Sequence, residues 1–263
     1  MNKEIIEQFA AELYQAQINR QAIAALTEKN SDFSVADAYA VQLLNVQKKL
    51  ALGDKISGKK IGLTSLAMQE MLGVNESDYG HLFVSMDCPD GKIDTGELLQ
   101  PKIEAELAFV LKEDLDKDDI SAADVLAATD YIVAAFEIVD SRIANWQIKL
   151  ADTVADNASS GAYVLGNIKV APGSVDLKNC KMSLYKTVAG QEKLVNEGFG
   201  SAVLGDPVLA VAWLANKLRS YGVSLQAGEI VLSGAFSAAP AAQAGESYRA
   251  VFSDFGELQA EFI

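Results

Sequence analysis

Two glutamates on one face of an apolar strand are the feature that most constrains the fold of this 263-residue chain. Glu104 and Glu106 lie in the segment QPKIEAELAFVL, residues 100–111, where apolar residues fill nearly every other position. Such alternation predicts a β-strand, and residues two apart on a strand point to the same side. The two carboxylates would therefore lie a few ångströms apart and repel each other unless a positive group lies between them. A divalent cation is the simplest such group.

A third carboxylate, Glu137, interrupts a β-branched and aromatic run over residues 131–142. A lone acid in so apolar a strand is costly to bury unpaired. Three carboxylates without histidine or cysteine suit a hard cation such as Mg²⁺ or Mn²⁺, which keeps positions open for water or substrate oxygens. Periodicity alone leaves an alternative of equal weight, in which the first two glutamates form the wet face of an edge strand, paired with nearby lysines, and Glu137 opens a loop.

Five segments resemble, in this order, the motifs of a known family: residues 58–65 (GKKIGLTS), 101–110 (PKIEAELAFV), 136–143 (FEIVDSRI), 152–161 (DTVADNASSG) and 231–235 (VLSGA). They look like the 2-keto-4-pentenoate hydratase family of the fumarylacetoacetate hydrolase-like superfamily. The resemblance covers nearly the whole chain, and five motifs in order are far more specific than any one of them. It implies a mixed β-fold, a Mg²⁺ or Mn²⁺ ion held by Glu104, Glu106 and Glu137, and substrates that are 2-oxo acids or their enols.

The resemblance also implies catalytic roles for Lys60 and Asp78. Lys60 would point from its strand into the site, where an ammonium neutralises a dienolate as negative charge develops. Asp78 matches the family's acidic residue before a glycine and is a candidate for proton transfer to or from the carbon skeleton. The plain alternatives are a solvated Lys60 beside Lys59 and a turn aspartate at position 78. Alternation places the two lysines on opposite faces, so at most one is buried toward the site.

Polar residues near two glycines are candidates for binding the substrate carboxylate. They are Asn157, Ser159, Ser160, Ser233 and Gly234. Asn and Ser are also common in plain loops and caps, and this alternative is slightly favoured for Asn157 and Ser159. Arg142 and Lys149 are weaker candidates for partners behind the site.

Composition and charge argue against several classes of protein. The chain is 50% hydrophobic, enough for a sizeable core, and 36 acidic against 22 basic residues give a formal net charge of -14. Such a field disfavours nucleic acid and anionic membranes as partners, and an anionic substrate then needs local positive charge from a metal or a lysine. The N-terminus has no signal-peptide core and no run of membrane-spanning length follows, so we expect a soluble cytoplasmic protein.

Cysteine and histidine are too few for several common sites. Cys88 and Cys180 lie far apart, which supports neither a zinc site nor a disulfide framework. His81 is the only histidine and no Gly-x-Ser-x-Gly segment is present, so a Ser-His-Asp triad is not supported. The carbon-carbon bond hydrolases of the superfamily generally use a histidine near an acid, and this chain has none before His81, which weakens hydrolysis as a function. A structural or surface role for His81 is favoured.

We predict one α+β domain over residues 1–263, with an N-terminal helical subregion (1–55) and a mixed β-roll or barrel core (56–263). Apolar spacing and caps predict helices over 3–28, 34–53, 65–73 and 208–221 and a short helix after Ser121. Strands are expected near 58–64, 100–111, 131–142, 162–170, 181–188 and 229–235, with a closing hairpin over 248–263. Between the helix over 65–73 and residue 80, a loop carrying Asp78 is predicted.

These observations favour a metal-dependent lyase that adds water to 2-hydroxypenta-2,4-dienoate and gives 4-hydroxy-2-oxopentanoate, a step in the degradation of aromatic compounds. Two alternatives stay open. One is a 4-oxalocrotonate decarboxylase, which acts on 2-oxohex-3-enedioate, and the other is a catalytically silent partner subunit or small-acid binding protein of the same fold. Residues 146–161 look more like the hydratase version of the family. We expect a homo-oligomer and, since hydratases and decarboxylases of this family associate, a pathway enzyme as a further partner.

The expected substrate pocket separates hydratase from decarboxylase. Two predicted loops, residues 78–83 and 233–243, contain no lysine or arginine. They offer Leu82, Phe83 and Phe236 instead, an apolar wall that suits an uncharged vinyl end. An unpaired second carboxylate would be costly to bury there.

Overall fold

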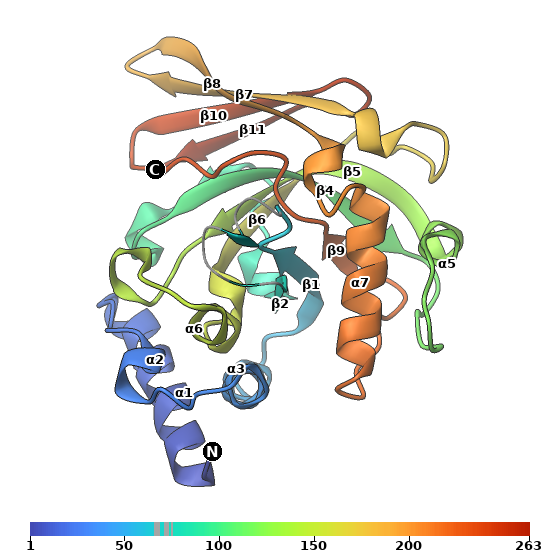
Figure 1. Cartoon of the computed structure of the whole chain (residues 1–263). Helices are drawn as coiled ribbons and strands as arrows, with labels where there is room; N and C mark the ends of the chain where they lie inside the picture. Colours follow the sequence, from blue (N-terminus) through green and yellow to red (C-terminus); the bar gives the residue numbers. More distant parts are fainter. Residues whose placement is uncertain (66–68, 71–73, 75) are drawn as a thin grey trace.

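The N-terminal helices lie together at one end of the molecule, far from the C-terminus (Figure 1). The computed structural model describes residues 1–65, 69–70, 74 and 76–263. In that part of the chain the α-helices are α1 (Lys3–Asn19), α2 (Leu26–Lys29), α3 (Val35–Ala51), α5 (Ala122–Ala128), α6 (Leu150–Ala155) and α7 (Pro207–Arg219). Short 3-10 turns are η1 (Val84–Met86), η2 (Thr95–Glu97), η3 (Ala144–Trp146), η4 (Asn157–Ser159), η5 (Leu177–Asn179) and η6 (Gly200–Ala202).

Capping residues explain where these helices begin and end. A capping box of Ser34 and Asp37 begins α3 as predicted, and a second capping box begins α5. The helix predicted over 3–28 is too long, because Arg20 adopts a left-handed φ of 52° and ends α1. Beyond it, Ile23 pairs with Ile143 in an isolated β-bridge, and Leu26 begins the separate helix α2. The helix predicted over 65–73 falls on residues that lie largely outside the described part.

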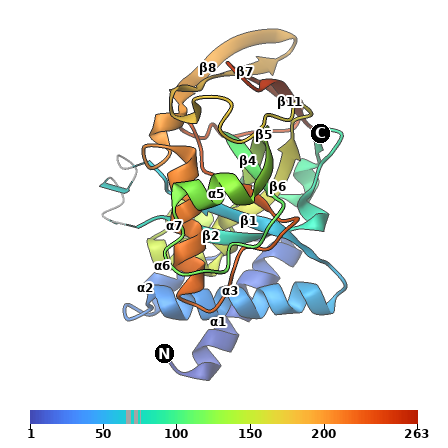
Figure 2. The same cartoon turned by 90° about the vertical axis from the view of Figure 1, so that its right-hand side faces the viewer.

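A six-stranded sheet occupies the centre of the molecule. Its strands in spatial order are β2 (Asp78–Phe83), β1 (Ile56–Gly62), β9 (Ile230–Leu232), β4 (Lys102–Leu111), β5 (Thr129–Val139) and β6 (Ser160–Leu165). Neighbours are antiparallel except β1 and β9, which are parallel. The sheet is curled, with β4 and β5 arching over β1, β2 and β6 (Figures 1 and 2). Side chains on its concave face therefore converge.

Strand β2 corrects the prediction of a loop up to residue 80. Asp78 pairs with Gly62 of β1 and begins a strand in which all six residues are buried. Gly80 is required there, because a Cβ at this position would lie 2.4 Å from the carbonyl oxygen of Asn157. The pairing with β1 is long-range, so the polar residues before Asp78 gave no local sign of it. The strand predicted over 162–170 is also shorter and ends at Leu165.

A second, five-stranded sheet packs over the first. Its order is β3 (Lys92–Ile93), β11 (Gly256–Phe262), β10 (Glu246–Phe252), β7 (Lys181–Val188) and β8 (Gln191–Phe199). Strands β10 and β11 are the predicted closing hairpin. One buried apolar cluster extends from Phe9 in α1 to Phe262 in β11. The α+β class is thus confirmed, while the division at residues 55 and 56 within a single domain stays a prediction.

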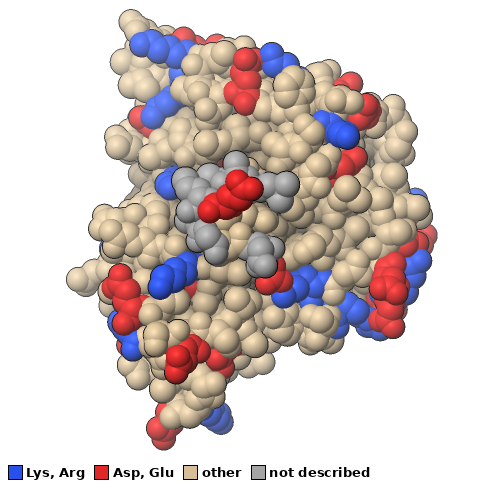
Figure 3. All heavy atoms as spheres, in the orientation of Figure 1, with Lys and Arg blue, Asp and Glu red and all other residues tan. Residues whose placement is uncertain are grey.

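Charge is mixed on the face shown in Figure 3. Lysine and arginine side chains lie scattered among the acidic ones there and do not gather into one basic patch. Within the described part of the chain, no helix combines the length and the apolar content needed to cross a membrane.

Candidate active site

Three glutamates meet on the concave face of the six-stranded sheet. Glu104 of β4 lies directly opposite Glu137 of β5 in the antiparallel register, and Glu106 lies two residues further along β4. Each offers one carboxylate oxygen, and these oxygens all lie within 4.8 Å of one another. Strand β4 is central, between β9 and β5, so the alternative of a wet edge strand is wrong. The alternative that Glu137 opens a loop is wrong as well, because Glu137 lies inside β5.

The carboxylate cluster is short of hydrogen-bond donors. Glu106 accepts a hydrogen bond from the N–H of Gly234 at 2.8 Å, and Glu137 has Lys60 Nζ at 3.2 Å and Ser160 Oγ at 3.4 Å. Glu106 Oε1 and Glu137 Oε2 are buried and have no partner among the described residues. An unpaired buried acceptor is costly, so two oxygens are left facing the point where a cation would be held.

Burial and mutual repulsion raise the pKa of these carboxyls. Desolvation is the largest cause at Glu106, followed by the charges of Glu137 and Glu104. Desolvation raises the pKa of Glu137 to about 8, although the Lys60 ammonium opposes this. Desolvation also raises the pKa of Glu104. One ammonium cannot balance three carboxylates, and the remaining negative charge suits a divalent cation.

Lys60 and Asp78 enter the same cluster from strands β1 and β2. Lys60 is only 2% exposed, so the alternative of a solvated residue is wrong. Its ammonium donates to the carbonyl oxygen of Ala158 at 2.9 Å. Burial lowers the pKa of Lys60, but Glu137, Asp78 and the other two glutamates outweigh burial and raise it above its ordinary value. The group is therefore an ammonium held among carboxylates.

Asp78 is a buried strand residue and not a turn aspartate. Its Oδ2 accepts a hydrogen bond from Thr153 Oγ1 at 2.6 Å, whereas its Oδ1 has no partner among the described residues. Gly62 makes room for both catalytic candidates, since a Cβ there would lie 2.2 Å from Asp78 Oδ1 and 3.1 Å from Lys60 Nζ. The free carboxylate oxygen and the ammonium thus approach the same point from two strands.

Lys59 shows how strictly alternation sorts the two lysines. It is buried as deeply as its neighbour, at 3% exposed, but faces the other way and pairs with Glu229 at 2.7 Å. The expectation that at most one of the two lysines points into the site holds.

The predicted carboxylate-binding residues divide into two groups. Ser160 touches Glu137, and the backbone N–H of Gly234 touches Glu106. Ser233 Oγ is buried with no partner among the described residues. The amide of Asn157 instead exchanges two hydrogen bonds with the backbone of His81, at 2.7 and 2.8 Å. Ser159 donates to Asp156, so these last two belong to a supporting network.

Sequence reasoning missed Thr153 and the Ala158 carbonyl. Thr153 lies inside one of the family-like motifs, and its spacing from Asp78 gave no signal because the contact joins positions 75 residues apart. The Ala158 carbonyl is a backbone group, which residue identity cannot reveal. Lys149 is exposed and precedes α6, and the structure places it with no partner role behind the glutamates.

His81 has a structural role. Its Nδ1 lies 2.9 Å from Gln42 Oε1 of α3, and burial lowers its pKa to about 3. The ring is therefore neutral, and its strand position faces away from Asp78.

The predicted apolar wall is wrong in Phe236. Phe236 packs against Phe252 in the main core, 5.7 Å between ring centroids. Phe83 lies beneath the Lys49 ammonium, 4.8 Å from its ring centroid. Leu82 shares the face of Asp78. Leu82 and Phe83 both belong to a small buried cluster that also includes Leu232, and a register shift between β1 and β2 brings Phe83 opposite Ile56. The first predicted loop is in fact strand β2, and the second packs inward, which is why Phe236 serves the core.

Known proteins resemble this chain in both sequence and fold. The family model described as fumarylacetoacetate (FAA) hydrolase C-terminal matches residues 86–263. A 2-keto-4-pentenoate hydratase of Paraburkholderia xenovorans (strain LB400) is 44% identical over 257 residues, which is 97% of this chain and 94% of the relative. A 2-hydroxypent-2,4-dienoate hydratase of Pseudomonas putida is 46% identical over 226 residues, 85% of this chain and 100% of the relative.

A solved structure extends the comparison to the whole fold. The 4-oxalocrotonate decarboxylase from Pseudomonas putida G7, complexed with magnesium and adipate, is similar with a TM-score of 0.94 at 35% identity. The similarity covers 100% of this chain and 99% of that chain. Fold and matched region together define an enzyme of the fumarylacetoacetate hydrolase-like class. Within that class the chain belongs to the 2-keto-4-pentenoate hydratase family, which confirms the predicted family and the predicted hydro-lyase activity.

Proposed function

We propose that this enzyme adds water to 2-hydroxypenta-2,4-dienoate and releases 4-hydroxy-2-oxopentanoate, as a step in the degradation of aromatic compounds. The observation that carries the proposal is the meeting of three glutamates, Lys60 and Asp78 on one buried face, in a chain whose relatives at 44% and 46% identity are hydratases of this substrate class.

Glu104, Glu106 and Glu137 are proposed to hold a divalent cation, Mg²⁺ or Mn²⁺. The residues fit such an ion, because two buried oxygens lack donors and all three ligands are hard oxygen groups. A bound ion would supply positive charge for the carboxylate and 2-oxygen of the substrate. The similar decarboxylase is described with magnesium in one structure and calcium in another.

Lys60 and Asp78 are proposed to divide the remaining chemistry. Lys60 keeps an ammonium beside the developing dienolate, where a desolvated charge is most effective. Asp78, whose Oδ1 is free while Thr153 holds Oδ2, moves a proton between the dienol and C5. Protonation at C5 with loss of the enol proton gives a 2-oxo-3-enoate. Water then adds its oxygen at C4 and its proton at C3.

One observation favours the decarboxylase as a second candidate. Lys102 precedes Glu104 by two residues on the same face of β4, and its ammonium lies 4.1 Å from the centroid of the Trp146 ring. None of the ion pairs among the described residues includes Lys102. A second carboxylate on the substrate could therefore find a cation that the predicted loops lack.

Both reactions should be measured on one preparation of the enzyme, with and without Mg²⁺. Ultraviolet absorbance and product mass follow hydration of the monoacid dienol, and released CO₂ follows decarboxylation of 2-oxohex-3-enedioate. We expect metal-dependent hydration and little CO₂. Efficient CO₂ release with the monoacid unchanged would establish the decarboxylase. Turnover of neither compound would favour the silent partner subunit or binding protein.

Four finer points are proposed on the sequence alone. The identity of the ion, Mg²⁺ or Mn²⁺, is tested by titrating each into metal-free enzyme. A homo-oligomer is tested by light scattering. Location in the cytoplasm and association with a pathway enzyme stay predictions for experiments in the source cell.

A further inference from the structure

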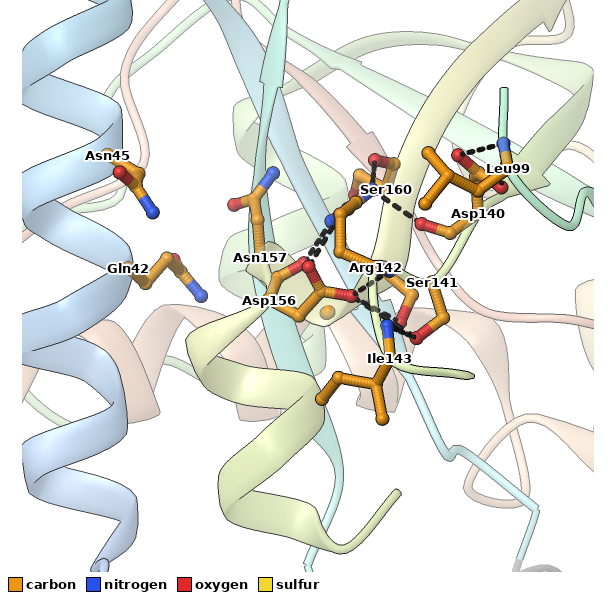
Figure 4. A network of polar contacts seen from close by, with 12 residues as sticks. Gln42, Asn45, Leu99, Asp140, Ser141, Arg142, Ile143, Asp156, Asn157 and Ser160 are labelled. Atoms are coloured by element: carbon orange, nitrogen blue, oxygen red, sulfur yellow. Dashed lines mark hydrogen bonds and ion pairs between the residues drawn. The ribbon is translucent and has the colours of Figure 1, made fainter. Parts of the chain in front are cut away.

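Arg142 and Asp156 form a buried ion pair beside the active site (Figure 4). Arg142 is 5% exposed and Asp156 is 3% exposed. The Arg142 side chain donates to the Asp156 carboxylate and to the carbonyl oxygens of Asp140, Asp156 and Ser160. It thereby joins the end of β5 to the start of β6.

The second oxygen of the Asp156 carboxylate accepts the remaining hydrogen bonds of this network. This oxygen, Oδ2, accepts hydrogen bonds from the Arg142 N–H at 2.9 Å and from the hydroxyls of Ser141 and Ser159, each at 3.3 Å. Both ends of η4 are therefore attached to one ion pair. The ion pair and the hydrogen bonds of Arg142 and Asp156 go to residues other than the three glutamates.

The backbone of η4 is unusual for non-glycine residues. Asn157, Ala158 and Ser159 have φ values of 56°, 48° and 54°, so three consecutive residues are left-handed. L side chains disfavour this region, and such a segment persists only where its surroundings hold it. On one side the Arg142 network holds it, and on the other the Asn157 amide is bound to the backbone of His81.

This turn directs the Lys60 ammonium. The Ala158 carbonyl oxygen, at the middle of the turn, accepts from Lys60 Nζ at 2.9 Å. Among the described residues, that ammonium also lies 3.2 Å from Glu137 Oε1. Lysine has a flexible four-carbon stem, so its ammonium has the direction that its acceptors impose. Relaxation of the left-handed turn would move one of the two.

We propose that Arg142 is a positioning residue that acts through Lys60. Its ion pair with Asp156 keeps η4 left-handed, and the Ala158 carbonyl then aims the Lys60 ammonium at the reacting oxygen. The proposal rests on the proposed function of Lys60. It differs from a purely structural role, in which loss of Arg142 would lower only the fraction of folded protein.

A double-mutant cycle separates the two roles. Arg142→Lys keeps the charge but loses the planar fork that reaches four acceptors. We expect kcat per folded molecule to fall at least about 10-fold, with KM and Mg²⁺ affinity changed less than about threefold. In a Lys60→Met background the same change should alter kcat less than about twofold, because residues that act as a unit are not additive.

Lys59→Met is the matched control. It also removes a buried ion pair, and Lys59 lies on β1 next to Lys60, but its side chain faces away from the site. It should lower thermal stability and leave kcat per folded molecule unchanged. Folded fractions are measured by circular dichroism at the assay temperature. Wild-type kcat in Arg142→Lys, or an equal loss in both backgrounds, would overturn the positioning role.

Two further outcomes keep the test decisive. If Arg142→Lys does not fold, Ser159→Ala removes one hydrogen bond to Asp156, and it should lower kcat severalfold only when Lys60 is present; full activity in it contradicts the proposal. If Lys60→Met has no measurable rate, the Arg142→Lys single variant decides the test: a lower kcat at unchanged KM supports the positioning role, and a wild-type kcat contradicts it. A wild-type rate in Lys60→Met would instead refute the proposed function of Lys60 itself.

Discussion

The two sheets of this protein bury opposite kinds of side chain. The inner face of the five-stranded sheet presents apolar residues such as Leu184, Phe252 and Phe262, each at most 2% exposed. The concave face of the six-stranded sheet buries Lys60, Glu106 and Glu137 to the same extent. Apolar burial stabilises a fold by roughly 25 cal/mol per Å² of surface, whereas buried charge is costly unless it is paired.

The difference indicates which sheet supports the fold and which supports the chemistry. Burying three carboxylates around one ammonium lowers the free energy of unfolding. Such a loss of stability is common at active sites. Substitutions on the concave face should therefore change activity more than stability. Substitutions in the five-stranded sheet should do the reverse.

The largest effect is expected from the metal site. Removal of divalent metal should abolish turnover, and Glu106→Gln should weaken Mg²⁺ binding by more than about 100-fold, since even residues behind a metal ligand affect affinity 10- to 100-fold. The apo variant should be at least as stable as wild type, because one repelling charge is gone and the amide oxygen can still accept from Gly234. Calorimetric titration with Mg²⁺ measures the first effect and urea unfolding the second.

Glu97→Gln is the control for that prediction, because the Glu97 side chain is 70% exposed. It should bind metal as wild type does. Equal activity after exhaustive chelation would contradict the metal assignment. A Glu106→Gln protein that does not fold would show that the glutamate cluster is structural.

Lys60→Met should lower kcat by about 10² to 10⁴-fold with a modest change in KM, because a charge interaction realised in the transition state is lost. Lys59→Met, next to it in sequence, should lose only stability. Steady-state kinetics on both variants compare the two faces of one strand directly. A pure rise in KM for Lys60→Met would make it a binding residue.

Phe252→Ala in the five-stranded sheet should lower the free energy of unfolding by about 3 to 5 kcal/mol, the usual result of truncating a buried phenylalanine. The rate per folded molecule should stay the same. Phe199→Ala, which truncates a ring 48% exposed in the same sheet, should change stability by less than about 1 kcal/mol. A large loss of kcat in folded Phe252→Ala would show that the two sheets are not independent in function.

The last effect depends on pH and concerns His81, a buried polar residue without a catalytic role. Its pKa falls from 6.5 to about 3 on burial, so between these values the unfolded chain binds a proton that the folded protein does not. Stability should therefore decrease as the pH falls, by about 1.4 kcal/mol per pH unit. Asp156, whose pKa rises from 3.8 to about 6, acts in the opposite direction over its own range.

His81→Gln should remove that part of the pH dependence and leave the contribution of Asp156 unchanged. Urea unfolding between pH 7 and pH 4 measures the difference between the two proteins. A difference that does not vary with pH would show that His81 titrates normally in the folded state.

Local signals explain why much of the fold could be predicted. The capping box at Ser34, the apolar alternation over 100–111 and the hairpin over 248–263 each depend on neighbouring residues, and each formed as expected. The β2 strand could not be predicted in the same way, because only pairing with β1 makes it extended. The assignment of Phe236 to a substrate wall failed for a related reason, since composition does not say which way a segment packs.

The sequence by itself determined that Glu104 and Glu106 share a face, because strand geometry makes that choice locally. Alternation separated Lys59 from Lys60 for the same reason. Only the tertiary structure decided that Glu137 lies opposite Glu104, that Asp78 comes within reach of Lys60, and that Arg142 holds the turn that aims this lysine. These contacts join residues between 14 and 98 positions apart, and they exist only once the sheet has curled.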